Sequence, residues 1–131
     1  MTKPARAYHQ AMLHYIRRTV SLADLVSGTA VVVGALPAGA LVYDAFAQVT
    51  TAFDSGTSDV LDIGTADDPD GFATDLAISA VGRLAADELA SSDDLVMAAD
   101  TDIHMTWTGA GTAATEGTVT VVVLFAVDND M

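Results

Sequence analysis

The feature that most constrains the fold is an apolar run that is interrupted at its middle. Residues 30–43 carry no charged side chain, but they number only fourteen and include two glycines and Pro37. A membrane-spanning helix needs about 20 predominantly apolar residues. Pro37 would break such a helix, whereas Pro37 followed by Gly39 suits a tight turn. We therefore expect a buried β-hairpin rather than a membrane anchor, with a strand over residues 29–35, a turn over 36–40 and a second strand over 41–50.

Two later segments also have strand patterns. Residues 101–108 alternate, with Ile103, Met105 and Trp107 on one face and polar side chains on the other, which is typical of a strand with one solvated face. Residues 117–127 are rich in β-branched side chains and apolar on both faces. Such a run suits a central strand covered from both sides, or one at a subunit contact.

Shorter segments complete the expected strands, and turn-forming patches separate them. We expect strands over residues 13–25, 58–64 and 95–100, and a single helical turn over residues 84–90. Residues 5–18 also have helical spacing, but a short helix is marginal without packing, so strand is the preferred interpretation there. Short strands separated by turns predict an all-β, single-domain antiparallel β-sandwich over residues 12–131, preceded by an extended basic arm over residues 1–11.

The charge of the chain is strongly uneven. Five Lys and Arg stand against eighteen Asp and Glu, for a net charge of −13. Residues 1–20 carry four of the five cations and no acid. The acidic remainder disfavours nucleic acid and anionic membrane as partners. The asymmetry fits either simple solubility, or adaptation to a salty habitat, or a basic arm that docks on an acidic surface. For the arm, the candidate partner-binding residues are Lys3, Arg6, Tyr8, Arg17 and Arg18.

No residue pattern announces a reaction or a bound cofactor. The chain has no cysteine, and His9, His14 and His104 lack the spacing of a zinc site. The acidic segment at residues 66–72 fails the EF-hand pattern, so a solvated turn is preferred there over a looser calcium site built from Asp67, Asp68 and Asp70. No nucleophile elbow, phosphate loop, zinc-protease motif or signal peptide is present. We expect no catalytic residue, metal or cofactor.

Aromatic side chains are the remaining candidates for binding, since a ring face can stack on a sugar. Trp107, Phe46, Phe53 and Phe125 all fall in strand or turn-edge positions. Core packing is the preferred interpretation for each of them.

Two segments resemble small structural proteins of tailed bacteriophages. They are "GALPAGALVYDAFAQVTTAFDSGTSDVLDIG" at residues 34–64 and "DIHMTWTGAGTAATEGTVTVVVLF" at residues 102–125. The family that they resemble includes capsid decoration, or cement, proteins with a jelly-roll-like β-sandwich. The resemblance implies a non-enzymatic virion protein on the outer surface of an icosahedral head, a homotrimer whose partners are the major capsid protein and itself. It implies no catalytic residue and does not extend to residues 1–20.

A second class of function fits the same sandwich. A carbohydrate- or receptor-binding module of a phage tail or adhesin would need an exposed aromatic side chain on a loop. The only Trp instead lies on an alternating strand, which counts against this alternative.

Overall fold

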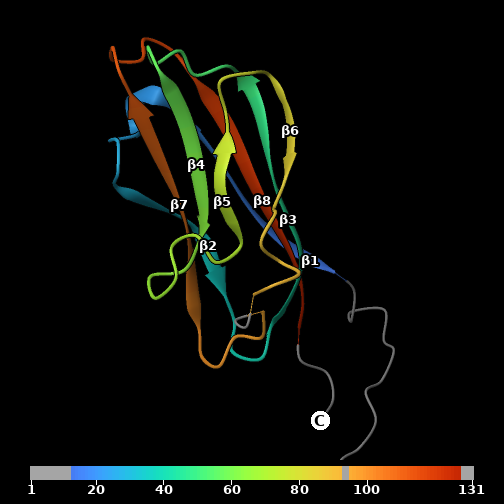
Figure 1. Cartoon of the computed structure of the whole chain (residues 1–131). Helices are drawn as coiled ribbons and strands as arrows, with labels where there is room; N and C mark the ends of the chain where they lie inside the picture. The colour runs from blue at the N-terminus through green and yellow to red at the C-terminus, as the bar shows by residue number, and fades with distance from the viewer. Residues whose placement is uncertain (1–12, 93–94, 128–131) are drawn as a thin grey trace, which may run out of the picture.

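The computed structural model describes residues 13–92 and 95–127, which form eight β-strands and one 3-10 turn (Figure 1). Their bounds are β1 His14–Ser21, η1 Leu22–Asp24, β2 Ala30–Leu36, β3 Leu41–Thr51, β4 Ser58–Gly64, β5 Ala73–Ala77, β6 Gly82–Ala85, β7 Thr101–Ala110 and β8 Thr118–Ala126. Within these residues no helix has the length and apolar character to cross a bilayer. The predicted arm, residues 1–11, lies outside the described residues.

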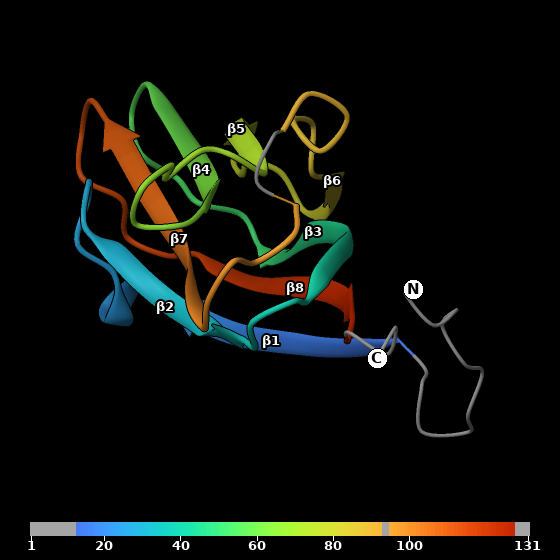
Figure 2. The same cartoon turned by 90° about the horizontal axis from the view of Figure 1, so that it is seen from below.

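The strands pair in a nested order. β1 pairs with β8, β2 with β7, β3 with β6 and β4 with β5, all antiparallel. The chain is thus one long ribbon, doubled back between β4 and β5 and then rolled up. Pairing of β3 with β8 and of β4 with β7 completes two four-stranded sheets, the first in the order β1-β8-β3-β6 and the second in the order β2-β7-β4-β5. This is a jelly roll, which confirms the expected β-sandwich (Figure 2).

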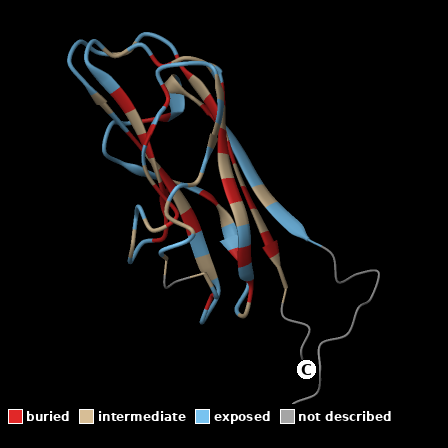
Figure 3. Cartoon of the chain, turned by 45° about the vertical axis from the view of Figure 1, so that its right-hand side comes forward, coloured by how far each residue is buried: buried red, intermediate tan, exposed pale blue. Residues whose placement is uncertain are grey.

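The core lies between the inner faces of the two sheets, where buried residues alternate with outward ones (Figure 3). Ile103, Met105 and Trp107 are buried on β7, as the alternation predicts. On β8 every second residue from Val119 to Phe125 is buried, but the intervening side chains are only half-buried. The strand is central in its sheet, yet the described residues cover only one of its faces.

The predicted hairpin over residues 29–50 is wrong. β2 lies in the second sheet and β3 in the first, so the turn between them crosses the sandwich instead of closing a strand pair. The backbone of the turn is tied to residues 95–100: Gly39 N–H donates to Met97 O at 2.7 Å, and Met97 N–H donates to Ala40 O at 2.9 Å. Gly39 has φ +83, as the turn chemistry predicts. Apolar alternation identifies strands, but it does not identify their partners.

Three other expectations need correction. Residues 95–100 form only one isolated bridge, Leu41 with Val96, because that segment braces the turn. The helical turn expected over residues 84–90 is wrong, since β6 runs to Ala85 and a non-helical turn follows. The helical alternative for residues 5–18 is wrong from His14 onward, where β1 begins, and its first residues lie outside the described part of the chain. The strand predicted over residues 58–64 is confirmed as β4.

Gly117 offers a test of packing at one end of the sandwich. A Cβ at this position would lie 2.4 Å from Phe53 Cδ2, and Phe53 is 1% exposed, so the ring has no room to retreat. We expect Gly117→Ala to lower the free energy of unfolding by about 1–3 kcal/mol, the usual cost of overpacking. Urea denaturation measures the change. Ala113→Ser, which adds one heavy atom at an exposed position of the same loop, is the matched control and should be neutral. Equal stability of the two variants would contradict the close packing of Gly117 against the Phe53 ring.

Candidate interaction surface

The two sheets carry opposite charge. All three arginines of the described residues, Arg17, Arg18 and Arg83, lie on strands of the first sheet. Of the fourteen acids in the described residues, which are the eighteen of the chain less four in undescribed segments, only Asp44 lies on those strands. The strands of the second sheet carry four aspartates and no lysine or arginine. A chain of net charge −13 therefore has one sheet with an excess of positive charge.

The outer face of the first sheet is apolar at its centre. Val122 and Leu124 of β8 point outward and are half-buried, and Phe46 of β3 lies directly opposite Val122. The guanidinium carbon of Arg83 stands 3.7 Å from the centroid of the Phe46 ring, a cation–π contact that keeps this charge on the face. Phe46 is thus not the core residue that its pattern predicts.

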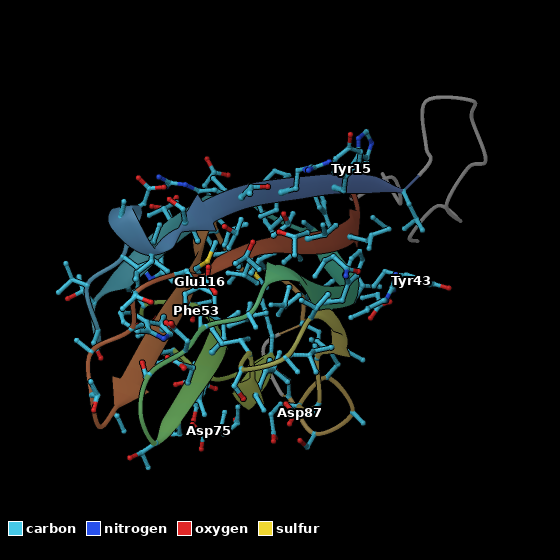
Figure 4. The ribbon with its side chains drawn as sticks, turned by 90° about the horizontal axis from the view of Figure 1, so that it is seen from above. Tyr15, Tyr43, Phe53, Asp75, Asp87 and Glu116 are labelled. Carbon is cyan, nitrogen blue, oxygen red and sulfur yellow. The ribbon has the colours of Figure 1, made fainter. Side chains whose placement is uncertain are left out.

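Exposed tyrosines flank this face at one end. Tyr15 of β1 is 64% exposed and pairs with Leu124 on β8, while Tyr43 is 67% exposed beside a register shift in β3. Figure 4 shows both side chains directed away from the sandwich at the same end, whereas Phe53 lies inside it. Towards the other end the face becomes polar, where Thr19 and Thr120 share a hydrogen bond of 2.7 Å.

The predicted partner-binding residues fall into two groups. Lys3, Arg6 and Tyr8 lie outside the described residues. Arg17 and Arg18 belong to β1 rather than to an arm, and they have different surroundings. Arg17 is exposed and lies opposite Val122, on the outer face.

Arg18 instead takes part in closing the sandwich. Its Nη1 donates to the carbonyl oxygen of Val32 on β2 at 2.7 Å, which joins the neighbouring edges of the two sheets. Beside it, a Cβ on Gly34 would lie 3.0 Å from Cβ of Ile16, so the glycine allows β1 and β2 to approach closely. This corner satisfies part of an edge strand that would otherwise be open.

Acidic side chains gather around the edge strand β5. Asp75 has φ +51, a conformation that Asp tolerates better than most residues, and its N–H donates to Asp62 Oδ1 at 2.7 Å. Burial raises the pKa of Asp62, and the charges of Asp75, Asp70 and Asp87 raise it further, against the lowering effect of the Asp75 N–H. Asp75 and Asp87 lie on the side of the sandwich away from β1 (Figure 4).

The acidic segment at residues 66–72, for which the sequence favours a solvated turn over a calcium site, forms a turn. In residues 13–92 and 95–127 no three His, Cys, Asp or Glu side chains come together as a metal site. The turn is instead held by its own backbone, with Thr65 N–H and Gly71 N–H both donating to Asp68 O at 3.0 Å. Among the histidines, His14 stacks on Phe125 at 5.7 Å, His104 lies on the polar face of β7, and His9 is outside the described residues.

Trp107 is part of a buried network rather than a sugar platform. Its Nε1–H donates to Asp59 Oδ1 at 2.9 Å, and Asp59, 2% exposed, also accepts from Ser55 N–H at 2.8 Å and from Ser55 Oγ at 2.5 Å. Three donors satisfy the buried carboxylate without a cation. Trp107 is 7% exposed and its ring centroid lies 5.8 Å from that of Phe53. Core packing is confirmed for Trp107, Phe53 and Phe125.

Sequence reasoning missed the surface as a whole. The concentration of cations in residues 1–20 suggested an arm and left Arg83 unassigned. The one usable signal was residues 117–127, where an apolar run on both faces indicated a subunit contact as one of two alternatives.

Comparison with known proteins gives structural neighbours only. No protein-family model matches the sequence, and no curated protein matches it. Among solved structures, a chain in the capsid of Ralstonia phage GP4 aligns with a TM-score of 0.71 and 17% identity, covering 96% of this chain and 92% of that one. A chain in the cyanophage Pam1 capsid asymmetric unit gives 0.67 and 14%, covering 98% and 93%. A chain in the acidic stable capsid of Helicobacter pylori bacteriophage KHP30 gives 0.66 and 15%, covering 88% and 87%. The chain has the fold of chains in phage capsids, over nearly their whole length.

Titration of two aspartates should change stability with opposite signs. Hydrogen bonds from the Thr115 hydroxyl and from the N–H groups of Thr115 and Glu116 lower the pKa of Asp54. The ionised carboxylate therefore stabilises the fold at any pH above the pKa that Asp54 has in the unfolded chain. This stabilisation is lost as the pH falls through the lower pKa of Asp54 in the folded chain. The pKa of Asp62 is raised, so its ionised form lowers the stability of the fold at neutral pH. This destabilisation disappears when the carboxylate is protonated.

We therefore expect Asp54→Asn to lower the melting temperature at neutral pH and Asp62→Asn to raise it, since an Asn oxygen can still accept from Asp75 N–H. Both differences from the parent chain should shrink in acid, where all three proteins are neutral at these positions. Melting curves from acid to neutral pH measure both differences. Equal effects of the two substitutions at every pH would contradict the opposite signs expected for Asp54 and Asp62.

The network around Trp107 should be needed for stability. Trp107→Ala is expected to cost about 3–5 kcal/mol as a large-to-small core change. Asp59→Asn is expected to cost about 1–3 kcal/mol, because one of its three donors would face an amide N–H₂. Denaturation followed by circular dichroism measures both, with Thr108→Ala, exposed beside Trp107 on β7, as the control. A stable Trp107→Ala chain that had lost binding to glycans would instead support the adhesin alternative.

Proposed function

We propose that this chain is a non-enzymatic structural protein of a phage virion that decorates the outer surface of the head and stabilises it by binding the major capsid protein. The observation that carries the proposal is the fold: the sandwich aligns with chains in three phage capsids over 87–93% of their length. The aligned chains are therefore close to this one in size, and the sandwich makes up most of each. A small sandwich of this kind suits an accessory subunit placed on a shell.

The surface of the sandwich supports a contact role rather than chemistry. Its buried carboxylate, Asp59, is fully occupied by Ser55 and Trp107, and the remaining acids around β5 face solvent or backbone N–H groups. The outer face of the first sheet, with Val122, Leu124 and exposed Tyr15 and Tyr43, offers apolar and aromatic area to another protein.

The basic residues 1–11 remain the proposed arm of this subunit. In the sequence they precede β1, whose first residue, His14, pairs with Phe125 near the end of β8. In this proposal Lys3 and Arg6 of the arm bind an acidic surface of the shell or of an adjacent copy. Repetition over a shell makes weak individual contacts effective, and a homotrimer is the proposed oligomer.

Co-sedimentation with empty heads of the parent phage, prepared without this chain, tests the proposal. The full chain should pellet with the heads, and raised salt should release it in part because charged contacts are screened. Deletion of residues 1–11 should weaken attachment and leave the melting temperature unchanged, since the deletion stops short of β1. If the deletion does not affect attachment, the arm has no part in binding to the head. If the full chain does not bind the heads, the proposed function is overturned.

The glycan- or receptor-binding alternative is retained as an outcome of the same experiment. Buried Trp107 cannot present its ring face to a sugar in this structure. A chain that ignores heads but binds a glycan array or host cells would favour that alternative.

A further inference from the structure

The side chains on the outer face of the first sheet are only half-buried along β8, and within residues 13–92 and 95–127 no second layer covers this face. Val122 and Leu124 of the central strand β8, with Phe46 beside them on β3, form the apolar centre. The second sheet covers only the inner face of β8. Contiguous apolar area on a folded chain commonly marks a contact with another macromolecule.

We propose that this face is the contact surface for a second copy of this chain, which seats an acid-bearing part of its own surface on it. The inference rests on the proposed function only in assuming that the copies meet in a virion. It concerns the contact between copies and not their attachment to the shell.

The charge distribution argues for a second copy as the occupant. The face presents Arg17 and Arg83, against Asp44 alone among the acids on these strands. Asp44 is half-buried, and its Oδ1 accepts from Ala45 N–H at 2.8 Å. Thirteen acids of the described residues lie off this sheet, so almost any other surface of a copy is negative. Two chains of net charge −13 repel each other unless the contact places unlike charges together, and among the described residues only this sheet carries arginine or lysine.

The area of the face is most, but not all, of what a stable protein–protein contact buries on each partner. At about 3.4 Å per residue, β8 is about 30 Å long, and four strands about 4.8 Å apart span about 19 Å, which gives at most about 600 Å². A stable interface buries about 800 Å² on each partner. Exposed Tyr15 and Tyr43, at one end of the face, add to this area.

The contact joins unlike surfaces. A basic, apolar face on one copy and an acidic surface on the next make a heterologous contact, which generates a ring when the rotation closes. A ring of three is the homotrimer proposed above.

Sedimentation equilibrium of the purified full chain over a dilution series tests the inference without heads. The parent chain should self-associate. Val122→Asp should raise the dissociation constant at least about tenfold, because an unpaired charge would be desolvated at the centre of the contact. Val60→Asp is the matched control: Val60 is also a half-buried, outward-facing valine on a central strand, but it lies in the second sheet between Thr108 and Ala77. It should leave self-association unchanged.

A second pair of variants keeps the test decisive if Val122→Asp fails to fold. Arg17→Thr and Thr108→Glu change net charge equally, from −13 to −14, at exposed positions of the first and second sheet. Arg17→Thr should weaken self-association severalfold at low salt, and the difference from the parent chain should vanish near 1 M salt, where screening acts within about 3 Å. Thr108→Glu should have little effect.

The inference is overturned by a parent chain that stays monomeric at its highest soluble concentration, or by equal effects of the two members of either pair. These outcomes are separate from failure of the proposed function. If the chain self-associates as expected but does not bind heads, the contact between copies stands and the decoration role falls. If it binds heads but stays monomeric, the decoration role stands and the contact between copies falls.

Discussion

The fold depends on pairing between strands from opposite ends of the chain. β1 and β8 form eight residue pairs in unbroken register, from His14 with Phe125 to Ser21 with Thr118. β8 also pairs with β3, so it is hydrogen-bonded along both of its edges. Its inward valines lie in the same core cluster as Ile103 and Met105 of β7. Without β8 the first sheet would have neither its centre nor its apolar wall.

The same strand connects stability with surface chemistry. A strand buried on both faces would be a core element only, but β8 keeps Val122 and Leu124 on the outside, where Arg17 and Phe46 flank Val122. The sheet edges are handled differently. Arg18 and Gly34 close the corner between β1 and β2, whereas β5 ends the second sheet with a register shift and surrounding carboxylates. The edges are thus protected against uncontrolled pairing, while one flat face remains for recognition.

Sequence reasoning found the long strands and missed two short or interrupted ones. Residues 101–108 have a clear period-two pattern, residues 117–127 are a run of β-branched side chains, and both form strands as predicted. β5 and β6 were not predicted: β5 is interrupted by Asp75 at φ +51, and β6 has only four residues. The hairpin error has another cause, because a short turn with Pro37 and Gly39 serves equally to pair two strands or to cross between sheets.

The interaction surface was hidden from the sequence because it is assembled from four strands far apart in the chain. Arg17 and Arg83 are 66 positions apart, and only the order β1-β8-β3-β6 brings them to one face. Counting charge along the chain placed the positive charge in a terminal segment. Counting it by sheet shows an excess on one side of the sandwich.

The nested pairing also determines when the chain can fold during its synthesis. β8 is made after the other seven strands, yet it belongs between β1 and β3. Until it leaves the ribosome, β1 lacks its strand partner and β3 can pair only with β6, while the local pair β4–β5 can already form. Folding should therefore wait for the synthesis of β8 and be slow for a domain of this size, as long-range pairing requires. The nascent chain would pass through a period in which unpaired strands are open to aggregation or to a chaperone.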